Sequence, residues 1–236
     1  MIETSIFLTC YDRPSQTKQC LPAIKKQCGD SVEIILCNDY HQDSPDLATF
    51  CAGLGVRYIH TGKQKQGKNM WRDGGFALNI GFQQSLGRNI IFGNSEILLV
   101  DESTISKMVT EINARAICSP RIRNEGTSEF LDCKLPFFLG MPRGIFSSIG
   151  GYDEDMTGYC FNDNDFSDRA LTRGVFKELD VIAVHLHNER GVLARKDTFI
   201  DNRAWEFNRA IYEQRKRILV RNEDRAWGQL DKEYVR

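Results

Sequence analysis

Short apolar runs alternate with amphipathic segments along the first sixty residues. Residues 4–11, 32–37 and 56–60 are apolar runs of strand length that end in polar side chains. Between them, residues 14–28 and 47–54 carry apolar side chains at helical spacing. Strands that alternate with helices predict a parallel sheet with crossover helices. Ligands of such sheets bind beyond the carboxyl ends of the strands, so the polar residues there are candidate site residues.

The rest of the chain continues this pattern. Further strands are expected over residues 89–93, 116–119, 136–141 and 175–185. Further helices are expected over residues 71–86, after a cap at Asp101, from residue 162 to about 173, and in a charge-rich tail from about residue 200. Because no long Pro, Gly or Ser linker divides the chain, we expect one α/β domain over residues 1–195 and a helical extension over 196–236.

The composition is that of a globular protein. Hydrophobic residues make up 41% and charged residues 27% of 236 residues, and 31 Lys and Arg balance 32 Asp and Glu. Nothing in this balance indicates a polyanionic partner, and no apolar run is long enough to span a bilayer. No secretory signal is visible, and the eight cysteines form no CxxC pair. We therefore expect reduced thiols in a cytoplasmic protein.

One basic loop comes close to a phosphate-binding loop. Gly62, Gly67 and Lys68 have the spacing GxxxxGK, but Asn69 stands where Ser or Thr would hold Mg²⁺. The loop also follows the third expected strand rather than the first. We therefore expect a solvated basic loop, and we keep a P-loop NTPase or kinase as an alternative.

Polar side chains end two of the expected strands. Asp39 follows the second strand, and Asn94 and Glu96 follow the fourth. The ends of parallel strands lie close together, so these groups can converge on one crevice. Asp39 can accept a hydrogen bond from a base, and Glu96 can bind a divalent cation. Taken singly, each is also a common turn or cap residue.

Two histidines close the last expected strand. His185 and His187 lie on the same face of a strand because side chains alternate. With Glu96 they would form a set of two nitrogens and one oxygen that suits Mn²⁺. The alternative is one partly buried and one solvated histidine.

Two carboxylates lie at the expected start of a helix, at Asp163 and Asp165. Both residue types cap helices well. A carboxylate at the edge of a cleft can also act as a general base toward an alcohol. Both functions can hold together, since two aspartates are available.

In this order the motifs resemble those of the family-2 glycosyltransferases with the GT-A fold. The resemblance covers residues 4–190 and is strongest to the branch with a galactosyltransferase-like C-terminal half. The motifs are Tyr11-Asp12-Arg13, Asn38-Asp39, Ala77-Leu78-Asn79-Ile80-Gly81, Asn94-Ser95-Glu96, Gly150-Gly151-Tyr152-Asp153-Glu154, and the segment from Gly158 to Asp165 with a late histidine. Asn94 and Asn162 stand where the family has carboxylates.

The resemblance implies a Rossmann-like mixed sheet flanked by helices, with a nucleotide-sugar half over residues 1–100 and an acceptor half over 101–195. It implies inverting transfer of a hexosyl group from a nucleotide-sugar, most often a UDP-sugar, to an acceptor hydroxyl. A divalent cation, Mn²⁺ or Mg²⁺, would assist. The two asparagines keep open the alternative of a degenerate module that binds a nucleotide or sugar without turnover.

The resemblance also implies roles for individual residues. Asp163 would be the catalytic base. Donor binding would fall to Thr9, Tyr11, Arg13, Asp39, Arg72, Asn79, Asn94 and Ser95. The cation would be held by Glu96 with His185 or His187. The acceptor would be positioned by Gly150, Gly151 and Asp165.

The acceptor itself stays open. A saccharide, a lipid-linked sugar, a protein side chain or a hydroxylated base in nucleic acid would each fit. A basic tail could meet an anionic acceptor or a membrane; its members are Arg203, Arg209, Arg215, Lys216, Arg217, Arg221 and Arg225. Acidic residues are interleaved with them, so an ordinary solvated helix face is the alternative.

Overall fold

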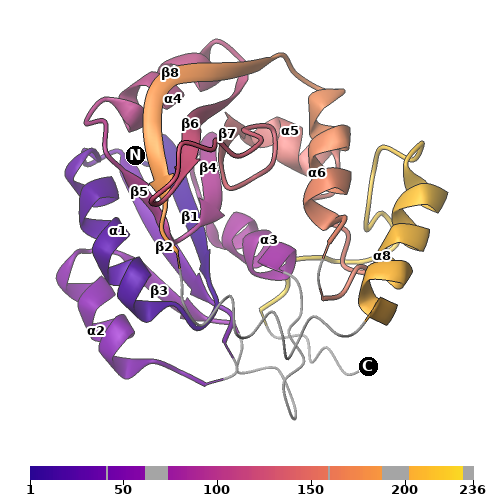
Figure 1. The fold of residues 1–236 in the computed structure, drawn as a ribbon, viewed down its shortest axis with the longest axis horizontal. Coiled ribbons are helices and arrows are strands. Elements are labelled where there is room, and N and C mark those ends of the chain that lie inside the picture. The colour runs from indigo at the N-terminus through magenta and orange to yellow at the C-terminus, as the bar shows by residue number, and fades with distance from the viewer. Residues whose placement is uncertain (41, 62–73, 159, 188–201, 231–236) are drawn as a thin grey trace.

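One mixed β-sheet runs through the molecule, and helices cover both of its faces (Figure 1). The computed structural model describes residues 1–40, 42–61, 74–158, 160–187 and 202–230. Within them the strands are β1 (Thr4–Cys10), β2 (Val32–Asn38), β3 (Arg57–His60), β4 (Asn89–Asn94), β5 (Ile97–Leu99), β6 (Ile117–Asn124), β7 (Phe138–Pro142) and β8 (Phe176–His185). The helices are α1 (Pro14–Lys26), α2 (Pro45–Gly53), α3 (Gly74–Gln84), α4 (Thr104–Asn113), α5 (Arg143–Ser148), α6 (Asn162–Leu171) and α8 (Asn202–Arg215).

The first half of the sheet is parallel. The strand order is β3-β2-β1-β4-β7-β6-β8-β5, and β1 pairs in parallel with both β2 and β4. Helices α1, α2 and α3 lie between these strands in the chain, as the alternating pattern predicts. The strands therefore end at one common edge, which is the lower edge in Figure 1.

The second half of the sheet is mixed. Strand β7 runs antiparallel to β4 and β6, and β8 runs parallel to β6. The short strand β5, which the sequence pattern did not predict, pairs with the end of β8 and places Ile97 opposite His185. This pairing brings the segment after β4 to the end of the last strand.

Alternating side chains of the central strand divide the core into two layers. Ile6 and Leu8 belong to the layer beneath α1, α2 and α4, whereas Phe7 belongs to the layer beneath α3, α5 and α6. Phe7 stacks on Phe92 with ring centroids 5.4 Å apart. A Cβ on Gly81 would lie 2.9 Å from Phe7, so the glycine lets α3 approach the sheet closely. Burying one large apolar side chain such as Phe7 contributes about 1.5–3 kcal/mol to the free energy of unfolding.

Most expected elements are confirmed, with two differences of extent. Helix α1 runs unbroken through Pro22. Strand β6 continues to Asn124, beyond the strand expected over residues 116–119, because the pairing with β8 resumes after a register shift between Pro120 and Arg121. None of the described helices is both long and apolar enough to cross a lipid bilayer.

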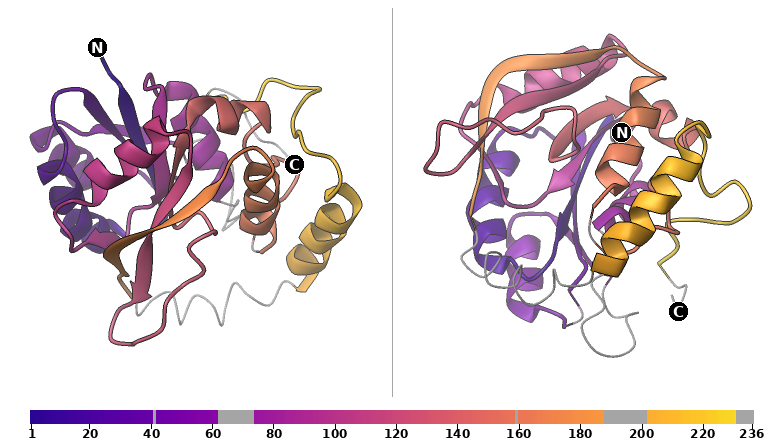
Figure 2. Two further views of the ribbon diagram at one scale, coloured as in Figure 1. Left: turned by 90° about the horizontal axis from the view of Figure 1, so that it is seen from above. Right: turned by 45° about the vertical axis from the view of Figure 1, so that its right-hand side comes forward.

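The C-terminal helix packs against the second half of the molecule. Figure 2 shows α8 beside α6, and in Figure 1 the N-terminal ends of both helices point to the same edge as the ends of β1 and β4. The chain then returns along α5 and α3, where Trp227 stacks on Phe82 with ring centroids 5.5 Å apart. The described part of the extension therefore packs against the core through Trp227.

Candidate active site

The ends of β1 and β2 enclose a small pocket at the common strand edge. Its volume is about 140 Å³, and Asp12, Arg13, Asn38 and Tyr40 contribute to its wall. The Tyr11 ring lies edge-on to the Tyr40 ring, with centroids 5.4 Å apart. Burial raises the pKa of Tyr11 to about 12, and the acidic groups nearby add to the effect, so its hydroxyl stays protonated.

Asp39 lies behind this pocket rather than in its wall. The carboxylate is buried and accepts a hydrogen bond from the Thr61 hydroxyl at 2.6 Å. Its backbone amide donates to the carbonyl of Cys10 at 2.8 Å. The predicted contact between Asp39 and a base stays a prediction, whereas Asn38 and Tyr40 face the pocket directly.

Thr9 presents a buried hydroxyl close to the start of α3. Its Oγ1 has no hydrogen-bond partner among the described residues, and a Cβ on Gly74 would lie 3.5 Å from the Thr9 methyl group. A buried, unsatisfied polar atom costs about 1–3 kcal/mol, so such atoms often mark a place where a ligand supplies the partner. This position suits the predicted role of Thr9 in donor binding.

The side chains of Asn94, Ser95 and Glu96 have three different environments. Glu96 is only 4% exposed, and its carboxylate pairs with Arg13. Ser95 is buried and shares a hydrogen bond of 2.7 Å with the Thr17 hydroxyl, so it anchors α1 and the predicted donor contact is at odds with its position. Asn94 is half-buried at the end of β4.

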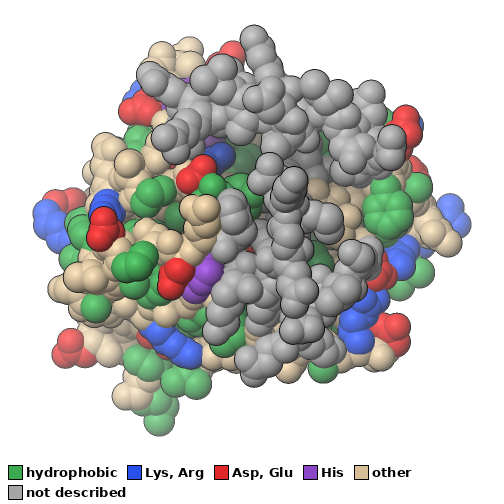
Figure 3. Space-filling model, turned by 90° about the horizontal axis from the view of Figure 1, so that it is seen from below, with side chains coloured by type: hydrophobic (Ala, Val, Ile, Leu, Met, Phe, Trp, Pro, Cys, Tyr) green, Lys and Arg blue, Asp and Glu red, His purple; other side chains and the backbone are tan. Residues whose placement is uncertain are grey.

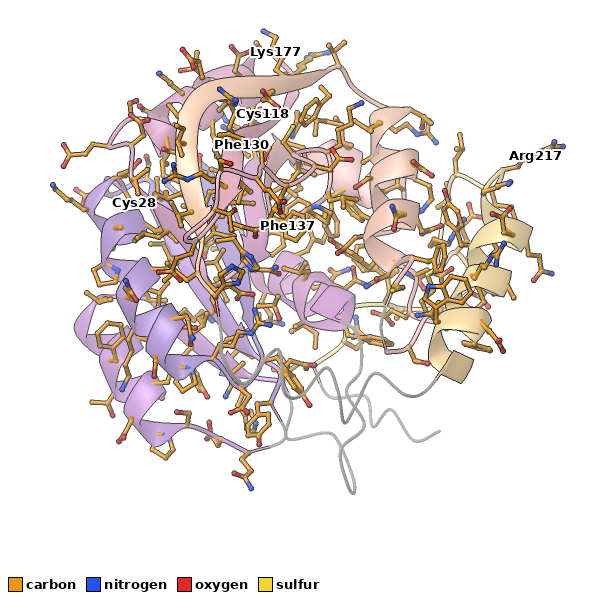
Figure 4. All side chains as sticks on the ribbon, in the orientation of Figure 1. Cys28, Cys118, Phe130, Phe137, Lys177 and Arg217 are labelled. Atoms are coloured by element: carbon orange, nitrogen blue, oxygen red, sulfur yellow. The ribbon has the colours of Figure 1, made fainter. Side chains whose placement is uncertain are left out.

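One of the two predicted histidines reaches Glu96. His185 Nε2 lies 3.5 Å from Glu96 Oε1, because β5 pairs with β8 at this point. Phe137, labelled in Figure 4, also packs near the imidazole of His185, with ring centroids 6.0 Å apart. His187 is exposed, and its ring centroid is 6.5 Å from that of His185.

These residues fit a divalent cation only in part. A buried carboxylate and an imidazole face each other, and oxygen with nitrogen ligands suits Mn²⁺. Arg13, however, already neutralises Glu96. Within the described ranges, no three His, Cys, Asp or Glu side chains form a cluster that could hold a metal ion.

Asp163 lies in the first turn of α6. Its side chain is half-buried, and no described lysine or arginine forms an ion pair with it. Burial raises the pKa of Asp163 from 3.8 to about 6, while the adjacent Tyr152 hydroxyl acts in the opposite direction. Tyr152 in turn fills the space beside Gly75, where a Cβ would lie 2.6 Å from its ring. The start of α3 therefore separates Thr9 from Tyr152 and Asp163.

Asp165 has a different environment although it is only two residues away. It is buried, and Arg169 donates to Oδ2 from Nε at 2.9 Å and from Nη2 at 2.6 Å. Arg221 donates to the other oxygen. Both oxygens thus accept from arginines, which gives Asp165 a structural role, and its predicted acceptor contact stays a prediction.

Asn79 and the Gly150-Gly151 turn are also structural. The Asn79 amide donates to the Tyr152 carbonyl and to Glu154, each at 3.0 Å, and accepts from the Tyr152 amide at 2.9 Å. A Cβ on Gly150 would lie 1.9 Å from the Arg221 carbonyl, so the returning chain covers this turn. These contacts hold the C-terminal half together, and the predicted contacts of Asn79 with the donor and of both glycines with the acceptor stay predictions.

The arginines of the tail form internal ion pairs. Arg221 is buried and its Nε lies 3.0 Å from Asp153, while Arg215 pairs with the same aspartate at 2.8 Å. Arg225 bonds both oxygens of Asp155 at 3.0 Å. Arg217 is exposed and points away from the strand edge (Figure 4). These contacts disfavour the idea that the tail as a whole meets an anionic surface.

Two predicted features lie outside the described residues. These are Arg72 and the basic loop from Gly62 to Asn69. Figure 3 shows the face at the strand edge, where acidic side chains lie beside basic and histidine side chains in the described part. The contacts of Tyr152 with Asp163 and of Arg221 with Asp153 and Asp165 were not predicted, because no local sequence pattern indicates them.

The mixed sheet is curled, and the candidate site lies at the strand edge. The comparisons with known structures show that this α/β fold is of the GT-A class. The model of glycosyl transferase family 2 matches residues 5–179, so the chain belongs to this family. No curated protein sequence matches it significantly.

Two solved structures show the same fold. The mannosyltransferase PcManGT from Pyrobaculum calidifontis, in complex with GDP-Man and Mn²⁺, has 15% identity and a TM-score of 0.63, covering 92% of this chain and 68% of its own. TarS 1-349 from S. aureus, in complex with UDP-GlcNAc, has 11% identity and a TM-score of 0.61 over 80% of this chain. The match spans 59% of that TarS chain.

Proposed function

We propose that the protein transfers a hexosyl group from a nucleotide-sugar to an acceptor hydroxyl with inversion at the anomeric carbon. Family membership and the GT-A fold support the reaction class. The observation that carries the proposal is Asp163, a half-buried carboxylate at the start of α6 that lacks a described cationic partner and has a raised pKa.

Asp163 acts as general base in this proposal. Its ionised carboxylate takes the proton of the acceptor hydroxyl as the oxygen attacks the anomeric carbon. The new bond forms between oxygen and carbon, and the bond to the diphosphate breaks on the opposite side with its electron pair. A placed base of this kind contributes about 10²–10⁴-fold to the rate.

The donor is expected in the pocket at the ends of β1 and β2. Arg13 lines this pocket with a guanidinium, and the Tyr40 ring in its wall contacts Tyr11, whose hydroxyl stays protonated. We propose a UDP-sugar, although one similar structure holds UDP-GlcNAc and another GDP-Man. Mass spectrometry of UDP- and GDP-sugars incubated with the protein tests this: release of UDP supports the proposal, and no hydrolysis or transfer from any donor contradicts it.

Glu96 and His185 would hold Mn²⁺ or Mg²⁺. When bound, such a cation supplies positive charge to the departing diphosphate. A thermal shift by Mn²⁺ in the presence of UDP tests the site. The shift should disappear in Glu96→Ala and persist in His187→Ala, because His187 does not contact Glu96. An unchanged shift in Glu96→Ala would remove this residue from the site.

We also propose which part of the chain carries which function. Residues 1–100 carry the donor pocket and residues 101–195 carry Asp163, while residues 196–236 brace the second half. The eight cysteines are all free, which fits the expected reducing cytoplasm.

A binding module without turnover is the second candidate. Asn94 favours it, since an amide replaces a charged ligand at this position. Binding of UDP by thermal shift, together with no hydrolysis or transfer from any donor or acceptor, would select the module over the enzyme.

A further inference from the structure

The N-terminal part of α8 places an exposed indole beside the segment that leads to Asp163. Trp205 is 41% exposed, and its ring centroid lies 5.5 Å from that of Phe161 at an interplanar angle of 64°. Phe161 stands two residues before Asp163 and also contacts Tyr212, with centroids 5.5 Å apart. An aromatic surface thus lies on the segment that leads to the proposed base.

This surface is fixed in place by α8. Asn208 is fully buried, and its amide donates to the carbonyls of Thr157 at 3.0 Å and Cys160 at 3.1 Å. It also accepts from the Thr157 backbone amide at 3.1 Å. The Tyr212 hydroxyl donates to Asp168 on α6. A side chain with all three bonds satisfied in the interior holds α8 against the loop in one position.

The backbone that carries Phe161 is held in an uncommon conformation. Cys160 and Phe161 have φ values of 76° and 68°, in the left-handed region that side chains other than glycine rarely adopt. Two such residues in succession persist only where surrounding contacts enforce them, and they concentrate at functional sites. The contacts with Asn208 and Trp205 provide that enforcement.

The polar groups around Trp205 suit a ligand with both apolar and hydroxylated sides. The Arg209 guanidinium lies 5.2 Å from the indole centroid, and Glu206 is exposed next to it. A pyranose ring has one face of C–H groups and a rim of hydroxyls. Such a ring can place its C–H face on an aromatic side chain while its hydroxyls bond to charged neighbours. Exposed aromatic surface with polar flanks often marks a ligand site.

We propose that Trp205 and Phe161 form the binding platform for a saccharide acceptor, which presents its hydroxyl to Asp163. This inference rests on the proposed transferase function and narrows the open acceptor classes to a carbohydrate. The platform lies partly outside the family match, which ends at residue 179, so α8 supplies an acceptor element that the family pattern does not include.

Helix α8 offers a matched control. Phe207 is 46% exposed, similar to Trp205, but two residues along a helix turn the side chain by about 200°. It therefore projects from a different side of α8. Phe207→Ala removes an exposed ring from the same helix without touching the platform.

The test is saturation-transfer NMR with a panel of cellobiose, chitobiose, lactose and maltose at millimolar concentration, in the presence of UDP. At least one disaccharide should bind the natural protein and Phe207→Ala equally. Its affinity should fall about tenfold in Trp205→Ala, a loss equivalent to one stacked ring. Trp205→Phe, which keeps an aromatic ring, should recover part of the affinity.

Donor hydrolysis measured on the same samples separates the two proposals. If the variants hydrolyse donor but no disaccharide binds, or Trp205→Ala binds as well as the natural protein, the platform is refuted and the transferase stands. The platform would also be refuted if the protein glycosylated a peptide and the Trp205→Ala variant did so at the same rate. If no sample turns over a donor while a disaccharide still binds through Trp205, the platform stands and the transferase function fails.

Discussion

Asp163 and Asp165 occupy the same turn of α6, yet their carboxylates have opposite environments. Asp165 is buried between Arg169 and Arg221, and each of its oxygens accepts from a guanidinium. Asp163 lies beside Tyr152, and burial raises its pKa to about 6. With no described guanidinium partner and this raised pKa, Asp163 can exchange a proton near neutral pH.

The same contrast separates the two halves of the molecule. The C-terminal half uses Asp153, Asp155 and Asp165 to bind arginines from α8 and the returning chain, so these carboxylates hold the structure together. Near the start of α3, the Thr9 hydroxyl has no hydrogen-bond partner among the described residues. The three paired carboxylates therefore serve the architecture of the protein, whereas the chemistry is proposed for Asp163, which has a raised pKa and no described cationic partner.

The strongest test of the contrast is Asp163→Asn. The amide cannot accept the acceptor proton, so the transfer rate should fall by about 10²–10⁴-fold while UDP still binds. Steady-state kinetics and a UDP thermal shift measure the two effects. A variant that transfers sugar at nearly the natural rate would exclude Asp163 as the base.

The same substitution should also make the protein more stable at neutral pH. The pKa of Asp163 in the folded protein exceeds its ordinary value of 3.8. Ionisation of this group therefore lowers the free energy of unfolding as the pH rises above 3.8, and the full loss is present above about pH 6. Removing the charge raises the free energy of unfolding by at most about 3 kcal/mol. Urea unfolding at pH 7 measures it, and a less stable variant would contradict the raised pKa.

The opposite outcome is expected for Arg221→Ala. The substitution leaves Asp153 and Asp165 buried beside one another without their shared cation, which should destabilise the fold by about 3–5 kcal/mol. Urea unfolding measures the change. Arg217→Ala is the matched control, since Arg217 is an exposed arginine of the same tail and should have little effect.

The pH profile sharpens the contrast further. Transfer requires ionised Asp163, so kcat/KM should fall about tenfold per pH unit below about 6 and level off above it. Tyr152→Phe removes the hydroxyl that lowers the pKa of Asp163, so the midpoint of the profile should move upward. A midpoint near 4 in the natural protein would refute the environment assigned to Asp163.

The smallest effect is expected at the outer pair of the C-terminal half. Arg225 holds the pKa of Asp155 near 2, so this pair stabilises the fold above about pH 4 and the contribution is lost as the pH falls toward 2. Both side chains are partly exposed, so Arg225→Ala should cost only about 0.2–1 kcal/mol at pH 7. A loss as large as that of Arg221→Ala would show that exposure does not distinguish the two pairs.

Local patterns in the sequence predicted most of the fold. Strand-length apolar runs and amphipathic helices depend on neighbouring residues, so the parallel half of the sheet and the helix that begins at Asn162 could be predicted directly. Strand β5 could not, because three residues carry no periodicity and the strand forms only by pairing with β8. That pairing is what places His185, rather than His187, against Glu96.

The sequence by itself determined the strands, the helices and the set of polar groups at the strand ends. Only the tertiary structure decided which of them face a site and which serve the interior. Asp163 and Asp165 have the same side chain and lie one residue apart, and Asn79 matches the family motif as well as Asp163 does. Their environments differ because residues more than fifty positions away, Arg221 above all, fold back onto one and not the other, and such long-range contacts depend on the packing of the whole chain.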